Sequence, residues 1–336
     1  MTRNIQEMLN PTEQQKEQIL CGIREKLERS NTSRHSMLRT ALVCTLVGAM
    51  ICTSAFAAVS FGLMDGLCTF LQPATPQQEE LLAQGAYAVN KSDNNQNGTL
   101  EVKQVIGDSN LVYLLLEFTA SEGVRLNQDN YRFSGALEAG QQTTGAGFFK
   151  ITDENENDNK ITLIMCEPTR EPAAGKRAVL ELYDLEGANK GENYQTILSG
   201  SWRISFPLNF EDCSIVYPVK QTLSAEGYDI TLQSISVSPL SITLRANSPY
   251  THEIIQSLDD KYAPYSDDSP RWFPVTIHYA DGALETAPCS GRMGQLTEIH
   301  HLTGDILDII TFDNLINDKE IQSIEICGYE IPLVQN

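Results

Sequence analysis

An apolar stretch without a single charged side chain is the feature that most constrains this 336-residue chain. Residues 40–64 contain no Asp, Glu, Lys, Arg or His, and a helix of these 25 residues is about 37 Å long at roughly 1.5 Å per residue. The hydrocarbon core of a bilayer is about 30 Å thick. We therefore predict a transmembrane helix over residues 39–64, with the lipid bilayer as the partner of residues 40–64.

Charged residues are distributed differently on the two sides of this stretch. Residues 1–39 hold seven Lys/Arg and five Asp/Glu, whereas the other 17 Lys/Arg and 39 Asp/Glu follow residue 64, a net charge of −22. Arg34 and Arg39 directly precede the stretch, so the positive-inside rule predicts residues 1–38 in the cytoplasm and residues 65–336 outside the cell membrane. The acidic outer part excludes nucleic acid as a natural partner, because its phosphates would be repelled.

A cleaved secretory leader is the alternative to an uncleaved anchor. Ala55-Phe56-Ala57 matches the pattern of small residues before a cleavage site, which leaves cleavage between Ala57 and Ala58 open. Such a leader would begin with about 40 residues that include five acids and a predicted helix, which is atypical of a signal peptide. The pattern favours the anchor.

The segment before the apolar stretch has the pattern of an amphipathic helix. Asn10 can cap it, Pro11 suits its first position, and Glu13 stands where a capping box places its acid. Apolar residues then recur at helical spacing in one stripe, formed by Ile19, Leu20, Ile23 and Leu27. One helix cannot bury its own stripe, so we predict that these side chains bind a cytoplasmic protein; a solvent-exposed helix is the alternative.

Beyond the membrane helix the hydrophobic pattern becomes that of a β protein. Pro73 and Pro76 interrupt the chain, and Gln77–Gly85 is predicted to form a short helix. Gly107–Asn110 and Asp281-Gly282 are hairpin turns by composition. Alternating apolar segments then predict the strands Thr99–Val105, Val112–Phe118, Gly147–Thr152, Lys160–Cys166, Ala178–Tyr183, Ser201–Phe206, Tyr228–Val237, Ser241–Ala246, Phe273–Tyr279, Leu284–Ala287, Leu307–Phe312 and Ile321–Ile326.

Short strands at this spacing predict a mainly β chain with two antiparallel β-sandwich domains. We expect a cytoplasmic helical segment over residues 1–38, a linker with a short helix over 65–86, the first sandwich over 87–218 and the second over 219–336. Trp202 alternates with Gly200, Ile204 and Phe206, which predicts core packing for its ring. Trp272 is the better candidate for an exposed contact.

Residues that could carry chemistry are sparse. Four cysteines of the outer part, Cys166, Cys213, Cys289 and Cys327, lie in or beside apolar segments, so free thiols and disulfides both remain open. Asp93–Gly98 matches the first half of a calcium loop, but Gln104 stands where the bidentate Glu is required, so a tight turn is the simpler interpretation. No catalytic motif is present in the sequence. We expect no metal, no cofactor and no enzymatic activity.

Four short segments together resemble a known family: Pro11–Ile23, Asn97–Val102, Gly200–Phe206 and Ile235–Leu240. They resemble Gram-positive single-pass membrane proteins with immunoglobulin-like extracytoplasmic domains of unknown function, encoded beside extracytoplasmic-function sigma factors. The resemblance implies immunoglobulin-like outer domains and an anti-sigma or sensor role. The HxxxCxxC motif of zinc-binding anti-sigma domains is absent, so no zinc-ligand role is carried over to Cys21.

The features combine into two hypotheses. In the first, the chain is a membrane-anchored regulator of the anti-sigma-factor type, whose cytoplasmic helix binds a sigma factor while the outer domains sense the envelope or an unknown extracytoplasmic ligand. In the second, it is a surface-displayed binding, adhesion or envelope-scaffolding protein, and the cytoplasmic helix only directs membrane insertion.

Overall fold

The computed structural model describes residues 65–140, 146–151, 158–262, 273–288, 295–300, 302–316 and 320–333. The chain divides into two compact units, residues 1–58 and 59–336, and every described residue belongs to the second unit. The predicted partner-binding residues Ile19, Leu20, Ile23 and Leu27 lie outside the described residues, as does the predicted membrane helix to residue 64. Among the described residues, no helix is long and apolar enough to cross a membrane.

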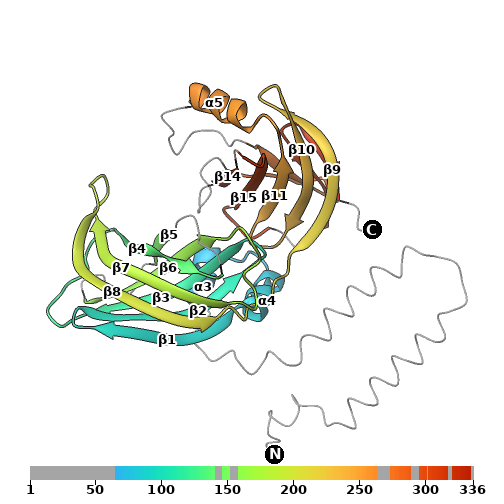
Figure 1. Ribbon diagram of the computed structural model, residues 1–336. Coiled ribbons are helices and arrows are strands. Elements are labelled where there is room, and N and C mark those ends of the chain that lie inside the picture. The colour runs from blue at the N-terminus through green and yellow to red at the C-terminus, as the bar shows by residue number, and fades with distance from the viewer. Residues whose placement is uncertain are drawn as a thin grey trace, which may run out of the picture. The chain divides into compact units, whose positions relative to one another are not determined.

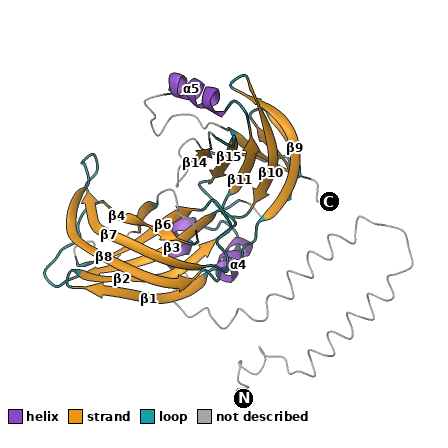
Figure 2. Cartoon of the chain, viewed as in Figure 1, coloured by secondary structure: helices purple, strands orange, loops and turns teal. Residues whose placement is uncertain are grey.

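The described part is mainly β, as predicted (Figures 1 and 2). Its strands form four antiparallel sheets. Two sheets enclose a first apolar core and form what we call the first sandwich. Its five-stranded sheet has the order β1 (Tyr87–Asn95), β2 (Gly98–Gly107), β3 (Leu111–Ala120), β6 (Lys160–Pro168) and β5 (Gly147–Ile151). The three-stranded sheet has the order β4 (Asn130–Glu138), β7 (Arg177–Ala188) and β8 (Gln195–Pro207).

Aromatic rings fill the centre of the first sandwich. Trp202 is 1% exposed, and its ring meets Phe118 and Phe133 edge-on at centroid distances of 5.2 and 5.6 Å. Its indole Nε1 donates a hydrogen bond to the carbonyl oxygen of Gly98 at 3.1 Å, which satisfies the buried donor. The prediction that Trp202 packs in the core is confirmed, whereas Trp272 lies outside the described residues.

A second apolar core lies between the other two sheets, which form the second sandwich. The five-stranded sheet has the order β14 (Gln295–Ile299), β15 (Asp305–Ile310), β11 (Ile242–Asn247), β10 (Tyr228–Val237) and β9 (Ile215–Ala225). The four-stranded sheet has the order β13 (Leu284–Thr286), β12 (Val275–Tyr279), β16 (Ile321–Ile326) and β17 (Tyr329–Pro332). Because β9 begins at Ile215, the strands of this sandwich start before Val219, the expected domain boundary.

In the described part of the chain, three helices accompany the sheets: α3 (Asp65–Leu71), α4 (Pro76–Gly85) and α5 (Thr251–Tyr262). The predicted short helix is confirmed in α4, where the Thr75 hydroxyl accepts a hydrogen bond from the Gln78 amide at 3.2 Å and Pro76 occupies the first turn. Helices α3 and α5 were not predicted. Ile254 and Leu258 of α5 are fully buried in the core of the second sandwich.

Both predicted hairpins are confirmed, since β2 pairs with β3 and β12 with β13 in antiparallel register. Strand β1 was not predicted, because Lys91–Asn95 is polar and shows no apolar alternation. It is an edge strand that pairs with β2, and Lys91 donates from Nζ to the carbonyl oxygen of Ser205 on β8 at 2.9 Å. Tertiary pairing rather than local pattern therefore determines this strand.

Candidate functional site at the junction of the two sandwiches

A third apolar cluster lies outside both sandwich cores, and we call this region the junction. The helices α3 and α4 supply Leu67, Leu71 and Leu82, all at most 6% exposed. The first sandwich supplies the outer face of its five-stranded sheet: Ile106, Leu111, Tyr113, Leu115, Ile164 and Cys166. The second sandwich supplies Leu240, Leu307, Ile309 and Leu315. Apolar burial therefore joins the two sandwiches and the two helices.

Helix α3 lies close against the first sandwich. A Cβ atom on Gly66 would stand 2.8 Å from the Leu115 side chain, so only glycine permits this approach without a shift. Phe70 stacks in tilted geometry on Tyr113 and Phe149, with centroid distances of 5.8 and 5.4 Å. The first described residues of the chain are thus packed in place rather than forming an open tether.

Helix α4 is tied to the second sandwich by a buried amide. Gln78 is 3% exposed, and its Nε2 donates to the carbonyl oxygen of Leu315 at 3.3 Å. Its Oε1 accepts a hydrogen bond from the Ala74 amide at 2.7 Å, so both ends of the side chain are satisfied. This contact fixes the position of α4 against Leu315 with directional bonds as well as apolar packing.

The centre of the junction holds a buried carboxylate, Asp108, in the turn between β2 and β3. Its Oδ1 accepts from the amides of Asn110 and Leu111, both at 2.9 Å. Its Oδ2 accepts from the hydroxyls of Ser238 and Ser241, at 2.5 and 2.6 Å. Those serines lie in the turn between β10 and β11, so one carboxylate connects a turn of each sandwich.

The burial of Asp108 has an electrostatic cost. Only 2% of the residue is exposed, and this desolvation raises the pKa of the carboxyl group above its usual 3.8. The hydrogen bonds from Ser238, Ser241 and Asn110 oppose the rise in pKa, while the nearby Asp212 charge adds to it. Ionisation of Asp108 is therefore less favourable in the assembled junction than it is in water.

A second polar contact crosses the junction beside the first. Arg245 on β11 donates from one guanidinium nitrogen to the carbonyl oxygen of Arg170 at 2.8 Å and to Asn110 Oδ1 at 3.4 Å. Arg170 in turn pairs through Nε with Oε2 of Glu298 on β14 at 2.5 Å. Residues of the first sandwich thus alternate with residues of the second along one chain of contacts.

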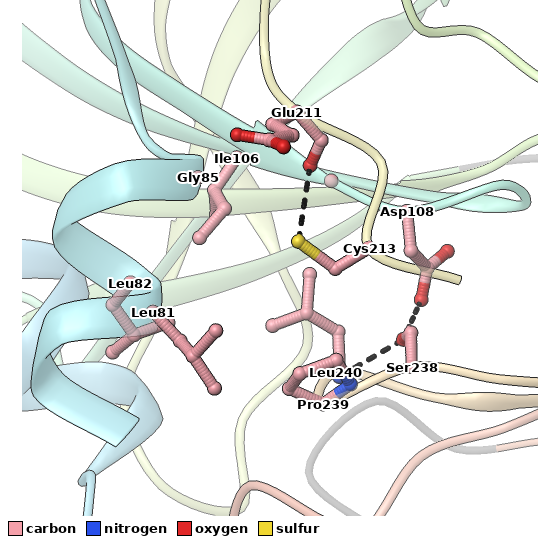
Figure 3. Close-up of a pocket in the computed structure, with 11 residues that line it drawn as sticks. Leu81, Leu82, Gly85, Ile106, Asp108, Glu211, Cys213, Ser238, Pro239 and Leu240 are labelled. Carbon is pink, nitrogen blue, oxygen red and sulfur yellow. Dashed lines mark hydrogen bonds between the residues drawn. The ribbon is translucent and has the colours of Figure 1, made fainter. Parts of the chain in front are cut away.

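A small cavity lies between α4 and the Asp108 turn (Figure 3). Leu81, Leu82, Ile106, Pro239 and Leu240 provide its apolar wall. Its volume is about 20 Å³, which is room for about one water molecule and for no larger ligand. We therefore interpret the cavity as a packing gap at the meeting point of three elements.

The serine hydroxyls at the centre of the junction are enclosed. Ser238 and Ser241 are 4% and 2% exposed, and Ser238 Oγ also accepts from the amides of Leu240 and Ser241, both at 3.0 Å. Hydroxyls enclosed in this way cannot reach a substrate. In the described ranges, no group of three or more His, Cys, Asp or Glu residues is placed to hold a metal ion.

The cysteines of the outer part differ in how deeply they are buried. Cys166 is buried in the junction, Cys213 is exposed in the segment that connects the sandwiches, and Cys327 is partly buried beside the second core. All three are free thiols, and Cys289 lies outside the described residues. Burial raises the pKa of Cys327 to about 11, so its thiol stays protonated at neutral pH.

The segment with a partial calcium-loop pattern is the hairpin between β1 and β2. Asp93 Oδ2 accepts the backbone amide of Arg203 at 2.8 Å, and Asn97 donates from its side chain to the Ser199 carbonyl. Gly98 adopts a φ of 152°, and a Cβ there would meet the Thr119 carbonyl oxygen at 2.5 Å. The interpretation as a tight turn is confirmed, and its polar side chains connect β1 to β8.

Sequence reasoning did not identify Asp108, Ser238 or Ser241 as site residues. It placed Gly107–Asn110 in a turn, and an Asp in a turn commonly accepts the amides that follow it. That signal accounts for the bonds to Asn110 and Leu111. The serines follow in the chain by 130 and 133 positions, and no local pattern relates them to Asp108.

The chain matches no family model and no curated protein. A similar solved structure is that of a conserved domain protein from Bacillus anthracis. The two are 11% identical, with a TM-score of 0.48, over 72% of this chain and 76% of that one. The comparisons assign neither a family nor an activity.

Proposed function

We propose that the chain is a membrane-anchored regulator of the anti-sigma-factor type. Residues 40–64 cross the membrane, and the helix before them binds a sigma factor through Ile19, Leu20, Ile23 and Leu27. The two sandwiches are immunoglobulin-like extracytoplasmic domains that sense the envelope or an extracytoplasmic ligand. A change in the sandwiches is passed to the cytoplasmic side through the membrane helix.

The packing of α3 into the junction is the observation that best supports this proposal. Helix α3 begins at Asp65, directly after the apolar stretch, and Leu67 and Leu71 are 1% and 6% exposed in the apolar cluster shared by both sandwiches. Because residues of both sandwiches belong to this cluster, we infer that a displacement of one sandwich against the other alters the packing around α3. In the proposed arrangement, this packing couples the end of the membrane helix to the outer domains.

The same observation favours a regulator over a surface-displayed binding module. A display protein needs only a spacer between membrane and domain, and a flexible polar segment provides that. Here the residues that follow the apolar stretch are two helices with buried leucines and a buried glutamine, Gln78. Such packing is unnecessary for display but is required if the outer domains are to act on the membrane helix.

Capture of a sigma factor by the full chain tests this proposal. Ile19→Asp combined with Ile23→Asp places two charges in the apolar stripe, and we expect recovery of the sigma factor to fall by about tenfold or more, as for residues at the centre of an interface. Gln14→Asp combined with Gln18→Asp is the matched control, because these residues lie opposite the stripe on the predicted helix and add the same charge. Equal recovery with both double variants, or no sigma factor with the unaltered chain, would refute the proposal.

A further inference from the structure

The Asp108 contact can exist in two protonation states without losing its geometry. In the ionised state both serine hydroxyls donate to Oδ2. Once Oδ2 carries a proton, it can donate to Ser241 Oγ along the same 2.6 Å line. The Ser238 hydroxyl then keeps Oδ2 as acceptor or turns to the Ser241 carbonyl oxygen, which lies 3.3 Å away. Hydroxyl groups rotate to suit either arrangement.

The groups around Asp108 favour the neutral state. Asp212 and Glu211 lie in the connecting segment, and Asp212 acts on Asp108 as a like charge. Glu167 is fully buried on β6 beside Cys166, and after burial the charges of Glu167 and Asp108 further raise the pKa of the Cys166 thiol. The guanidinium group of Arg245 bonds to Asn110 Oδ1 rather than to the Asp108 carboxylate. The thiols of Cys166 and Cys213 also lie close enough to Asp108 for its charge to raise their pKa values.

We propose that the junction is a proton-sensitive contact in which the Asp108 carboxyl group joins the β2–β3 turn of the first sandwich to the β10–β11 turn of the second. Acidification tightens this contact, and alkalinisation loosens it. When the turns separate, water reaches Asp108 and the charged form regains its hydration. The role of the contact in signalling rests on the proposed function, whereas the proton sensitivity itself does not.

The direction follows from linkage between proton binding and closure. The closed contact holds Asp108 buried and binds a proton more readily than the open contact, where the carboxyl group is hydrated. Closure is therefore most favoured below the usual pKa of 3.8 and least favoured above the raised value of the closed state. Each unit between the two pKa values changes the closing equilibrium about tenfold.

Hydrogen exchange of the purified full chain in detergent tests the proposal without any partner. The reporters are the amides of Leu111, Leu240 and Ser241, which all donate within the contact. After correction for intrinsic exchange, we expect their protection to rise severalfold on acidification from about pH 8 to about pH 4, as the pH falls through the raised pKa of the closed contact. Asp108→Asn, which resembles the protonated form, should show high protection that does not depend on pH. Glu122→Gln, an exposed carboxylate of the same sandwich, is the control and should follow the unaltered chain.

Two further variants keep the test decisive if Asp108→Asn does not fold. Ser241→Ala removes a donor that favours the charged carboxylate, so the midpoint of the pH dependence should move up. Asp212→Asn removes the like charge, so the midpoint should move down. The proposal would be overturned if the midpoints of Ser241→Ala and Asp212→Asn moved in the same direction. It would also be overturned if Asp108→Asn kept the pH dependence of the unaltered chain. Loss of sigma-factor capture with these shifts intact would overturn the proposed function instead.

Discussion

The core of the first sandwich and the junction are both buried, yet they are built from different interactions. The core around Trp202, Phe118 and Phe133 consists of apolar side chains with one indole hydrogen bond. The junction combines apolar packing with a carboxylate, a buried amide and an ion pair. Apolar burial is non-directional and grows with area, whereas the polar contacts hold only in one geometry. The first region maintains the fold, and the second determines how its parts meet.

The free energies of the two regions differ accordingly. A fully buried large apolar side chain contributes roughly 1.5–3 kcal/mol, and about 20 of them add up in each core. A typical hydrogen bond contributes about 0.5–1.5 kcal/mol net, and desolvation of a carboxylate such as Asp108 subtracts from that. The net free energy of the polar contacts in the junction is therefore closer to zero than that of apolar burial in the cores. A change in protonation can shift these contacts without unfolding the cores.

Truncation of the core should have the largest effect. Trp202→Ala removes a ring that is 1% exposed, and we expect it to lower the free energy of unfolding of the first sandwich by about 3–5 kcal/mol. Chemical denaturation followed by circular dichroism measures the loss. Tyr183→Ala on the neighbouring strand β7 is the control, because Tyr183 is 44% exposed. This substitution should change the free energy of unfolding by no more than about 0.5 kcal/mol. A similar loss in both variants would contradict the central role of the ring.

Truncation inside the junction should cost less and act locally. Leu82→Ala on α4 removes a side chain that is 2% exposed, for an expected loss of about 2–3 kcal/mol, at the lower end for buried leucine because helix edges relax. Hydrogen exchange should rise in α3 and α4 while β3 and β7 keep their protection. Gln77→Ala, exposed on the same helix, should leave all four elements unchanged. Exchange that rises equally in β3 would show that the junction and the core form one cooperative unit.

The sequence predicted the cores better than the junction, for a physical reason. Core strands such as β3 show apolar residues in a local pattern, because one sheet face must be buried. Helix α5 also carries a local signal in the spacing of Thr251, Ile254 and Leu258, which was obscured by the strand pattern on either side. The i, i+3, i+7 spacing of these three residues is that of a helix with one buried face.

The junction could not be predicted in the same way. Local turn chemistry accounts for half of the Asp108 contacts, and the other half depend on Ser238 and Ser241 in a distant turn. The outer face of the five-stranded sheet also carries apolar residues such as Tyr113 and Ile164, so its strands alternate less clearly. Apolar runs of this kind are typical of strands buried on both faces, but nothing in them identifies the covering elements.

The smallest expected effect concerns the ion pair across the junction. A double-mutant cycle with Arg170→Ala and Glu298→Ala should give a coupling energy of about 0.2–1 kcal/mol, because the Arg170 side chain is 48% exposed and water screens the pair. Denaturation at low and high salt measures this coupling and its screening.

The pair Arg132–Glu186 inside the first sandwich is a matched control, since its side chains are 50% and 22% exposed against 48% and 18% for Arg170 and Glu298. Equal coupling in the two cycles would mean that the junction holds its charges no more firmly than a sheet surface does. Apolar packing and the Asp108 contact would then determine its closure. A coupling several times larger for Arg170 and Glu298 would instead show a rigid junction, because only a pair held in fixed geometry and shielded from water exceeds the surface value.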